Sequence, residues 1–246
     1  MRSQSIFLFP AFLVMLFNSF ACSTIEKEKI QQVQKPAIVS YVGEIHSGTT
    51  GITESIFRYM DKKFALKLYE VTRKELRRLG WKALSYKKMT NNRKYRELVR
   101  YRARRFKTFR RLDKTSAKMS LPRLMNSNDL SSSIRRKKAL KALSADALIE
   151  IEFTISPKSG FWQSVGLGLM EVDRDLFDYK HYEASVHITA YDGKSNRPIW
   201  TSFSWGQSSD EQTLTVSGIS IDGKRKKAIL SAYRNALSSL VDDALE

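Results

Sequence analysis

Residues 147–155 read ALIEIEFTI, and apolar side chains alternate with polar ones from Ile149 to Ile155. Successive side chains of a β-strand point to opposite faces, so this alternation predicts a strand with one buried face. A helix is expected just before it, because the serines at 131–133 can cap a helix that continues through Leu143. A helix followed by such a strand indicates an α/β layer structure.

The C-terminal part of the sequence predicts a hairpin followed by a helix. Residues 182–191 alternate apolar and polar side chains, DGKSN at 192–196 supplies turn residues, and 198–205 returns as the partner strand. From near Asp222, a helix with one buried face is expected, because apolar residues recur at four-residue steps. These residues are Ile229, Tyr233, Leu237, Val241 and Leu245.

The N-terminal part predicts a strand, a helix and a second strand. Residues 37–42 are rich in β-formers, 52–79 carry a helical apolar stripe that Gly80 ends, and 81–86 favour a short strand. We therefore expect a single α/β domain over 36–246: a sandwich of a mixed β-sheet with packed helices, plus a basic helix inserted within 87–130.

The first residues are typical of a secretory signal. Arg2 precedes an apolar run from Ile6 to Phe17, which is too short to span a bilayer. Residues 19–22, SFAC, resemble the site at which a bacterial lipoprotein is cleaved and acylated, although Ser19 stands where an aliphatic residue is usual. We expect a signal peptide over 1–21 and lipidation of Cys22; the alternative is a plain signal peptide with a chance cysteine.

Residues 22–35 are then expected to be a polar tether between the membrane and the domain. Because Ser23 rather than Asp follows the cysteine, resemblance to the enteric sorting rule favours the outer membrane, with a periplasmic or surface-exposed domain.

The segment 87–114 is the most basic part of the chain. It carries thirteen Lys and Arg residues and two acids, a net charge of +11 out of +18 for the whole chain. Aromatic and aliphatic residues lie between the charges near helical spacing, which predicts a cationic amphipathic helix. The expected anion-binding residues are Arg93, Lys94, Arg96, Arg100, Arg102, Arg104, Arg105, Lys107, Arg110 and Arg111.

Two interpretations of this helix remain open. It can contact an anionic surface, or its apolar stripe can pack on the sheet while the arginines face water. We favour the first, because so many uncompensated charges repel one another. In an exported protein the available anions are anionic lipid, lipopolysaccharide and wall polymers, and nucleic acid is not expected as a partner.

Several function classes are excluded or disfavoured. Apolar residues make up 42% of the chain, which excludes disorder throughout, and one cysteine excludes a disulfide framework. No catalytic motif is present, so we expect no enzyme activity, no cofactor and no metal site. His181 and His187 share one face of a strand but lie about 20 Å apart, too far to bind one ion. An enzyme acting on wall polymers would need two carboxylates brought together in a cleft.

The order of elements resembles one superfamily of envelope lipoproteins. Besides Cys22, the resemblance depends on a Gly80-Trp81 turn, the entry Ser144-Ala145-Asp146 to a strand, and a hairpin from Tyr191-Asp192 to Ile199-Trp200. The superfamily contains the penicillin-binding-protein activator lipoproteins and the curli secretion lipoprotein. The resemblance implies a non-enzymatic interaction or assembly module for cell-wall or outer-membrane machinery, with an envelope protein as a possible partner. The alternative is a surface adhesin-like protein that binds polyanions.

Overall fold

The computed structural model describes residues 24–46, 62–103, 116–121, 123–125, 127–159, 179–208 and 223–246. Its centre is a six-stranded mixed sheet in the order β1-β6-β5-β4-β2-β3. Only β2 and β4 pair in parallel; the other neighbours are antiparallel. The strands are β1 (Thr24–Ile25), β2 (Ala37–His46), β3 (Ser116–Ser120), β4 (Ala147–Ser159), β5 (Tyr179–Asp192) and β6 (Pro198–Gln207).

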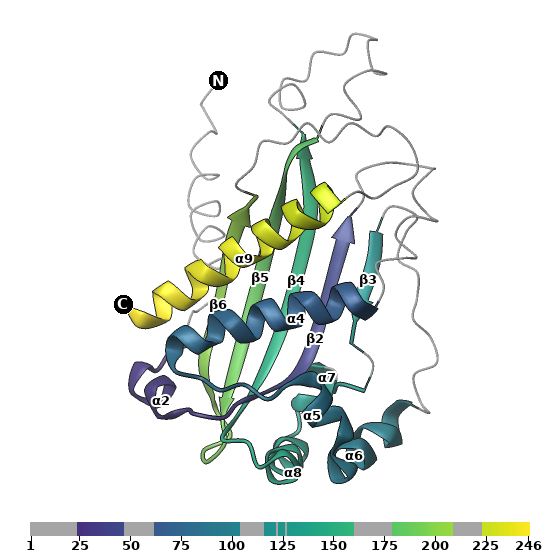
Figure 1. Cartoon of the computed structure of the whole chain (residues 1–246). Helices are drawn as coiled ribbons and strands as arrows, with labels where there is room; N and C mark the ends of the chain where they lie inside the picture. Colours follow the sequence, from purple (N-terminus) through teal and green to yellow (C-terminus); the bar gives the residue numbers. More distant parts are fainter. Residues whose placement is uncertain are drawn as a thin grey trace, which may run out of the picture.

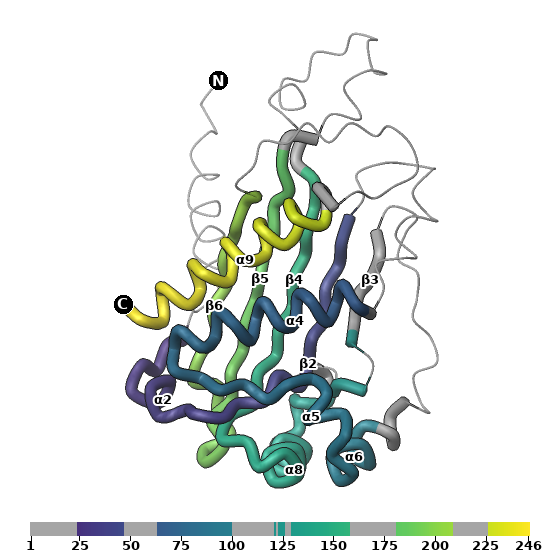
Figure 2. The backbone as a smooth tube through the Cα atoms, viewed as in Figure 1, coloured from purple at the N-terminus to yellow at the C-terminus, as the bar shows by residue number. Residues whose placement is uncertain are grey.

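Two long helices cover one face of this sheet, and shorter helices gather at one end of it (Figures 1 and 2). The covering helices are α4 (Lys62–Leu76), continued by the 3-10 turn η2 (Arg77–Leu79), and α9 (Gly223–Leu245). The shorter helices are α2 (Lys27–Gln32), α5 (Tyr86–Asn91), α6 (Arg93–Ala103), α7 (Ser127–Leu130) and α8 (Ser133–Leu143). No helix in the described part of the chain is both long and apolar enough to cross a bilayer.

The predicted α/β architecture is confirmed. The strand expected at 147–155 is the start of β4, the expected hairpin is β5 and β6, and the helix expected from Asp222 is α9. Gly80 ends η2 with φ 80°, the left-handed conformation that glycine adopts most easily. The two-residue period of β4 therefore predicted correctly which side chains enter the core: Ile149, Ile151, Phe153 and Ile155.

Small residues on β6 let α9 approach the sheet closely. Ser202, Ser204 and Gly206 lie on the face of β6 that carries α9, and all three are buried. A Cβ atom at Gly206 would lie 2.2 Å from the backbone nitrogen of Ala236 and 2.5 Å from the carbonyl oxygen of Ala232. The backbones of β6 and α9 are therefore in direct contact at this point.

A buried tyrosine network joins the covering helices to the sheet. The hydroxyl of Tyr41 on β2 donates to that of Tyr233 on α9 at 2.9 Å, and the Thr72 hydroxyl on α4 lies 2.8 Å from the same oxygen. The Phe153 ring packs against Tyr41 and Tyr233, and it occupies the space that a side chain at Gly43 would need. This satisfied polar cluster fixes how β2, α4 and α9 sit together.

The expected tether over 22–35 is wrong from Thr24 onward. β1 pairs with β6, α2 follows it, and Ile30 and Val33 are buried in the core. The Asp146 carboxylate accepts the backbone N–H groups of Gln34 and Lys35, both at 2.7 Å. A carboxylate that accepts two N–H groups holds the segment firmly, so residues 24–35 are part of the domain.

The short strand expected at 81–86 is also wrong. Residues 81–85 have no regular secondary structure, although Lys82 and Leu84 donate their N–H groups to the carbonyls of Gln34 and Pro36. The chain then enters α5, because the Ser85 side chain caps it by accepting from the N–H of Lys88 at 3.2 Å.

Candidate functional site

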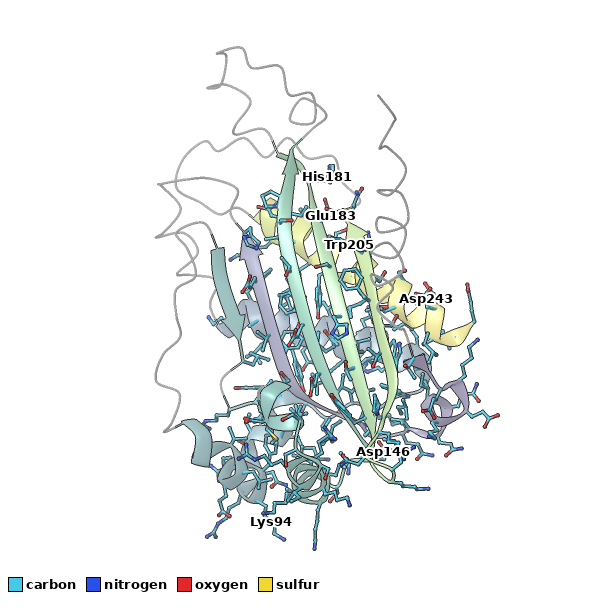
Figure 3. All side chains as sticks on the ribbon, turned by 180° about the vertical axis from the view of Figure 1, so that it is seen from behind. Lys94, Asp146, His181, Glu183, Trp205 and Asp243 are labelled. Carbon is cyan, nitrogen blue, oxygen red and sulfur yellow. The ribbon has the colours of Figure 1, made fainter. Side chains whose placement is uncertain are left out.

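Three helices form a basic end at one end of the sheet. α5, α6 and α8 contact one another in the order α5–α6–α8. Up to Val99, they carry ten Lys and Arg side chains and one acid, Glu97. Figure 3 places Lys94 at this end, beyond the strands. We call the surface formed by α5, α6 and α8 the basic end.

Six lysines of the basic end are exposed and carry unpaired charge. None has an acidic partner within ion-pair distance among the described residues. They are Lys87 and Lys88 on α5, Lys94 on α6, and Lys137, Lys138 and Lys141 on α8. The pair of Arg93 with Glu97 at 3.2 Å is highly exposed and neutralises little of this charge.

The apolar side of α6 faces the protein. Tyr95 is fully buried, and Leu98 and Val99 are half-buried against the core. Up to Val99, α6 therefore cannot insert an apolar face into a bilayer while the fold is intact. The apolar stripe therefore packs on the protein, as in the second of the two interpretations given above. Only the charged side of this part of the helix is available to an anion.

The structure describes only some of the expected anion-binding residues. Arg93 and Lys94 are exposed, whereas Arg96 is half-buried, and its Nε has no hydrogen-bond partner in the described residues. The backbone of α6 includes Arg100 and Arg102. Outside the described residues lie Arg104, Arg105, Lys107, Arg110, Arg111 and the expected lipidation site Cys22.

The contribution of α8 to the basic end was not predicted. The run Arg135-Arg136-Lys137-Lys138 was a signal in the sequence, but its distance in the chain from α6 hid the contact. Its two arginines serve the fold: Arg135 pairs with Asp129 at 3.1 Å, and Arg136 donates to Asn196 at 2.6 Å and lies 4.5 Å over the Tyr191 ring. The three lysines of α8, Lys137, Lys138 and Lys141, remain exposed to solvent or a ligand.

A partly buried carboxyl lies close to α8. Burial and the neighbouring Glu152 raise the pKa of Glu150 to about 7, and the charge of Arg136 opposes this shift. One carboxyl oxygen of Glu150 is buried with no hydrogen-bond partner among the described residues. Ionised Glu150 is therefore poorly solvated and destabilises the folded state.

Glu150→Gln should stabilise the protein at pH 8 and change its stability little at pH 4. The folded-state pKa of Glu150 lies above its unfolded value, so the wild-type protein loses stability as the pH rises from about 4.5 to about 7, and the Gln variant lacks this loss. Thermal unfolding of both proteins at a series of pH values measures the difference. A difference that does not change with pH would contradict this account.

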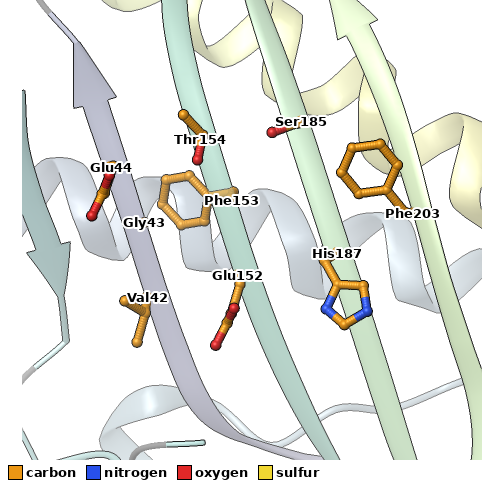
Figure 4. A pocket seen from close by; sticks show the side chains of 9 residues that line it. All are labelled: Val42, Gly43, Glu44, Glu152, Phe153, Thr154, Ser185, His187 and Phe203. Carbon is orange, nitrogen blue, oxygen red and sulfur yellow. The ribbon is translucent and has the colours of Figure 1, made fainter. Parts of the chain in front are cut away.

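The face of the sheet opposite α4 and α9 carries a shallow depression of about 300 Å³ (Figure 4). Its lining includes Glu44, Glu152, Ser185, His187 and Phe203. In Figure 3, no described helix lies over the half of this face that carries His181, Glu183 and Trp205. The open face therefore presents two carboxylates, a histidine and aromatic rings in one place.

Two carboxylates line this depression, those of Glu44 and Glu152. An enzyme acting on wall polymers would need two carboxylates brought together, so the depression meets this one requirement.

The two histidines of β5 are too far apart to bind one ion together. His181 and His187 are six residues apart on β5, opposite Lys158 and Glu152. Within the part of the chain that the structure describes, no group of three His, Cys, Asp or Glu residues could hold an ion.

No protein-family model matches the chain, and no curated protein matches its sequence. Solved structures with a similar arrangement include the LpoB C-terminal domain from Salmonella enterica, at 6% identity and TM-score 0.32, over 79% of this chain and 92% of that one. A homologue of a neuraminyllactose-binding hemagglutinin from Helicobacter pylori has 9% identity and TM-score 0.35, over 87% and 83%. A lipoprotein from Neisseria meningitidis has 9% identity and TM-score 0.30, over 84% and 99%.

One of these similar structures is described as a lipoprotein. TM-scores of 0.30 to 0.35 are too low for these similarities to carry an argument about function.

Proposed function

We propose that this protein is a non-enzymatic bacterial envelope lipoprotein, anchored through acylated Cys22, that serves as an interaction module. Its basic end contacts an anionic surface. The main support is the set of six exposed lysines, without acidic partners among the described residues, on three helices in contact. Like charges held this close repel one another, and an anionic ligand relieves that repulsion.

The location of the protein determines which anions it can meet. An exported protein meets anionic lipid, lipopolysaccharide and wall polymers, and each Lys or Arg near such a surface contributes about 1 kcal/mol. The acidic surface of an envelope protein is a further candidate partner. We assign the protein to the outer membrane, and nucleic acid is not a proposed partner.

An acyl anchor on Cys22 would lie close to the domain. Thr24 already pairs with Thr201, so two peptide units separate Cys22 from the sheet. Two residues span at most about 7 Å, which replaces the longer tether expected from sequence. The acylated protein would therefore be held against its membrane rather than suspended from it.

Cys22→Ala should abolish labelling with radioactive palmitate and release the protein from the membrane fraction. The chain has one cysteine, so no other thiol can carry the acyl chains. Detergent phase partitioning of the wild type and the variant provides the measurement. Ser23→Ala is a matched control that should remain labelled. Unchanged attachment and labelling in Cys22→Ala would contradict the lipoprotein assignment.

A second candidate is a surface adhesin-like protein that binds polyanions outside the cell. The arrangement of the helices favours it, because α6 lies on the opposite side of Figure 1 from α2, which follows directly after β1. The basic end can therefore extend away from the anchor. Protease treatment of intact cells distinguishes the two candidates: complete protection supports a periplasmic domain, and rapid cleavage supports the adhesin.

A further inference from the structure

Two exposed aromatic side chains on β6 lie in contact with each other. Phe203 is 44% exposed and Trp205 is 59% exposed, and their ring centroids lie 5.0 Å apart. The other large exposed apolar side chains among the described residues, Ile134 and Leu245, lie on α8 and α9. Paired aromatic rings left in water are typical of a contact surface.

The aromatic pair lies on β6, the strand with which β1 pairs. Thr24 pairs with Thr201, and β1 runs antiparallel to β6, so the chain reaches Thr24 from the direction of Phe203 and Trp205. Cys22 is within about 7 Å of Thr24, because only Ser23 lies between them. Acyl chains on Cys22 would therefore enter the membrane close to the aromatic pair.

The carboxylates of the open face do not prevent this contact. Phe203 and Trp205 lie on the second strand from the sheet edge, beside the two-residue β1. Glu183 is the nearest carboxylate of the open face, on the neighbouring β5 and opposite Gln207, whereas Glu152 lies on β4 and Glu44 on β2. Neighbouring strands are about 4.8 Å apart, so Glu152 lies about 10 Å from β6. An edge-on approach brings the two rings to the bilayer, leaves Glu152 and Glu44 in water, and places Glu183 among the polar headgroups.

We propose that Phe203 and Trp205 contact the headgroup region of the bilayer that holds the acylated Cys22, and so orient the domain edge-on. This inference rests on the proposed function, because Cys22 supplies the anchor. Aromatic side chains favour this region, since their rings are apolar and the indole N–H can still bond to water or headgroups. In this orientation α6 lies at the far side of the sheet, which favours a polymer over the anchoring lipid as its ligand.

Brominated lipids provide the test, because bromine quenches tryptophan fluorescence at short range. The chain beginning at Cys22 retains every described element, and its single thiol can be coupled to a maleimide lipid in neutral phosphatidylcholine vesicles. With Trp162→Phe, the remaining tryptophans are Trp205 and the fully buried Trp81 and Trp200. We expect dibrominated phosphatidylcholine to reduce the Trp205 emission, since an indole at the headgroup boundary lies close to the brominated acyl chains.

A matched variant moves the fluorophore to the basic end. Trp162→Phe/Trp205→Phe/Ile134→Trp places the exposed indole on α8, where Ile134 is 64% exposed, and it should not be quenched. Thermal unfolding confirms that each variant is folded. No quenching of Trp205, or equal quenching of the α8 tryptophan, would overturn the inference.

The chemical anchor keeps this result separate from acylation in cells. A protein that is not labelled with palmitate would overturn the proposed lipoprotein function, while the coupled vesicles would still report whether Trp205 contacts lipid. A protein that is labelled but shows no quenching would retain the proposed function and lose the aromatic contact.

Discussion

Replacing Lys94, Lys137, Lys138 and Lys141 with Gln is expected to weaken binding of the protein to anionic vesicles or lipopolysaccharide by about a thousandfold at low salt. Each lysine near an anionic surface contributes about 1 kcal/mol, so removing four costs about 4 kcal/mol. All four are exposed, and Gln favours helices about as well as Lys. The unfolding midpoint should therefore hardly change.

The salt dependence of binding provides a second measurement. Binding driven by released counterions weakens linearly on a logarithmic scale of salt concentration, and the slope is proportional to the number of contacts. The variant should therefore show a smaller slope than the wild type. Titration of both proteins at several salt concentrations measures it.

Four lysines on the covering helices provide the matched control. Lys67 and Lys74 on α4 and Lys226 and Lys227 on α9 are also exposed, and replacing them with Gln removes the same charge from a different surface. This control should bind almost as tightly as the wild type. If both variants lost the same affinity, the attraction would depend on net charge alone and the basic end would have no specific role.

The sheet and its covering helices could be predicted because their signals are local. Apolar and polar residues alternate in β4 and β5, which indicates a sheet with one apolar face packed against helices. Apolar residues recur at four-residue steps in α9, which indicates the helix that packs on this face. Gly80 marks a helix end by its left-handed backbone conformation. Ser132 lies at the N-cap of α8, where a serine was expected, although its side chain makes no capping hydrogen bond. None of these signals depends on a distant part of the chain.

The elements that were missed depend on distant partners. β1 has two residues and exists because β6 offers an edge, and α2 is held by Trp81, whose indole donates to the Ile30 carbonyl at 2.9 Å. Residues 22–35 are polar in sequence, so only these contacts reveal that the segment folds. β3, at the other edge of the sheet, likewise has no alternation strong enough to predict it.

The candidate site was predicted in part for the same reason. The charge of α6 is visible in the sequence, but the orientation of its apolar stripe depends on the core that receives Tyr95. The lysines of α8 join the surface because α8 packs on α6, across about forty residues of chain. The sequence thus predicts an anion-binding surface, and tertiary packing determines which lysines lie together at the basic end.

Gly206→Ala is expected to lower the free energy of unfolding by about 3 kcal/mol or more, since overpacking a tight contact costs about 1–3 kcal/mol and a clash with backbone lies at the upper end. The added Cβ would lie 2.2 Å from the Ala236 nitrogen, and a backbone atom cannot rotate away as a side chain can. α9 must therefore shift along its contact with β6. In a domain of this size, the unfolding midpoint should fall by about 8 °C.

Gly80→Ala separates this clash from the general effect of adding a methyl group. Gly80 has φ 80°, and a Cβ there would meet no atom within 4 Å, so the substitution costs only the strain of a left-handed alanine, about 1 kcal/mol. Denaturant unfolding of both variants measures the two losses on one scale. If Gly206→Ala cost no more than Gly80→Ala, α9 would not rest on β6 at backbone contact, and the small residues at 202, 204 and 206 would need another explanation.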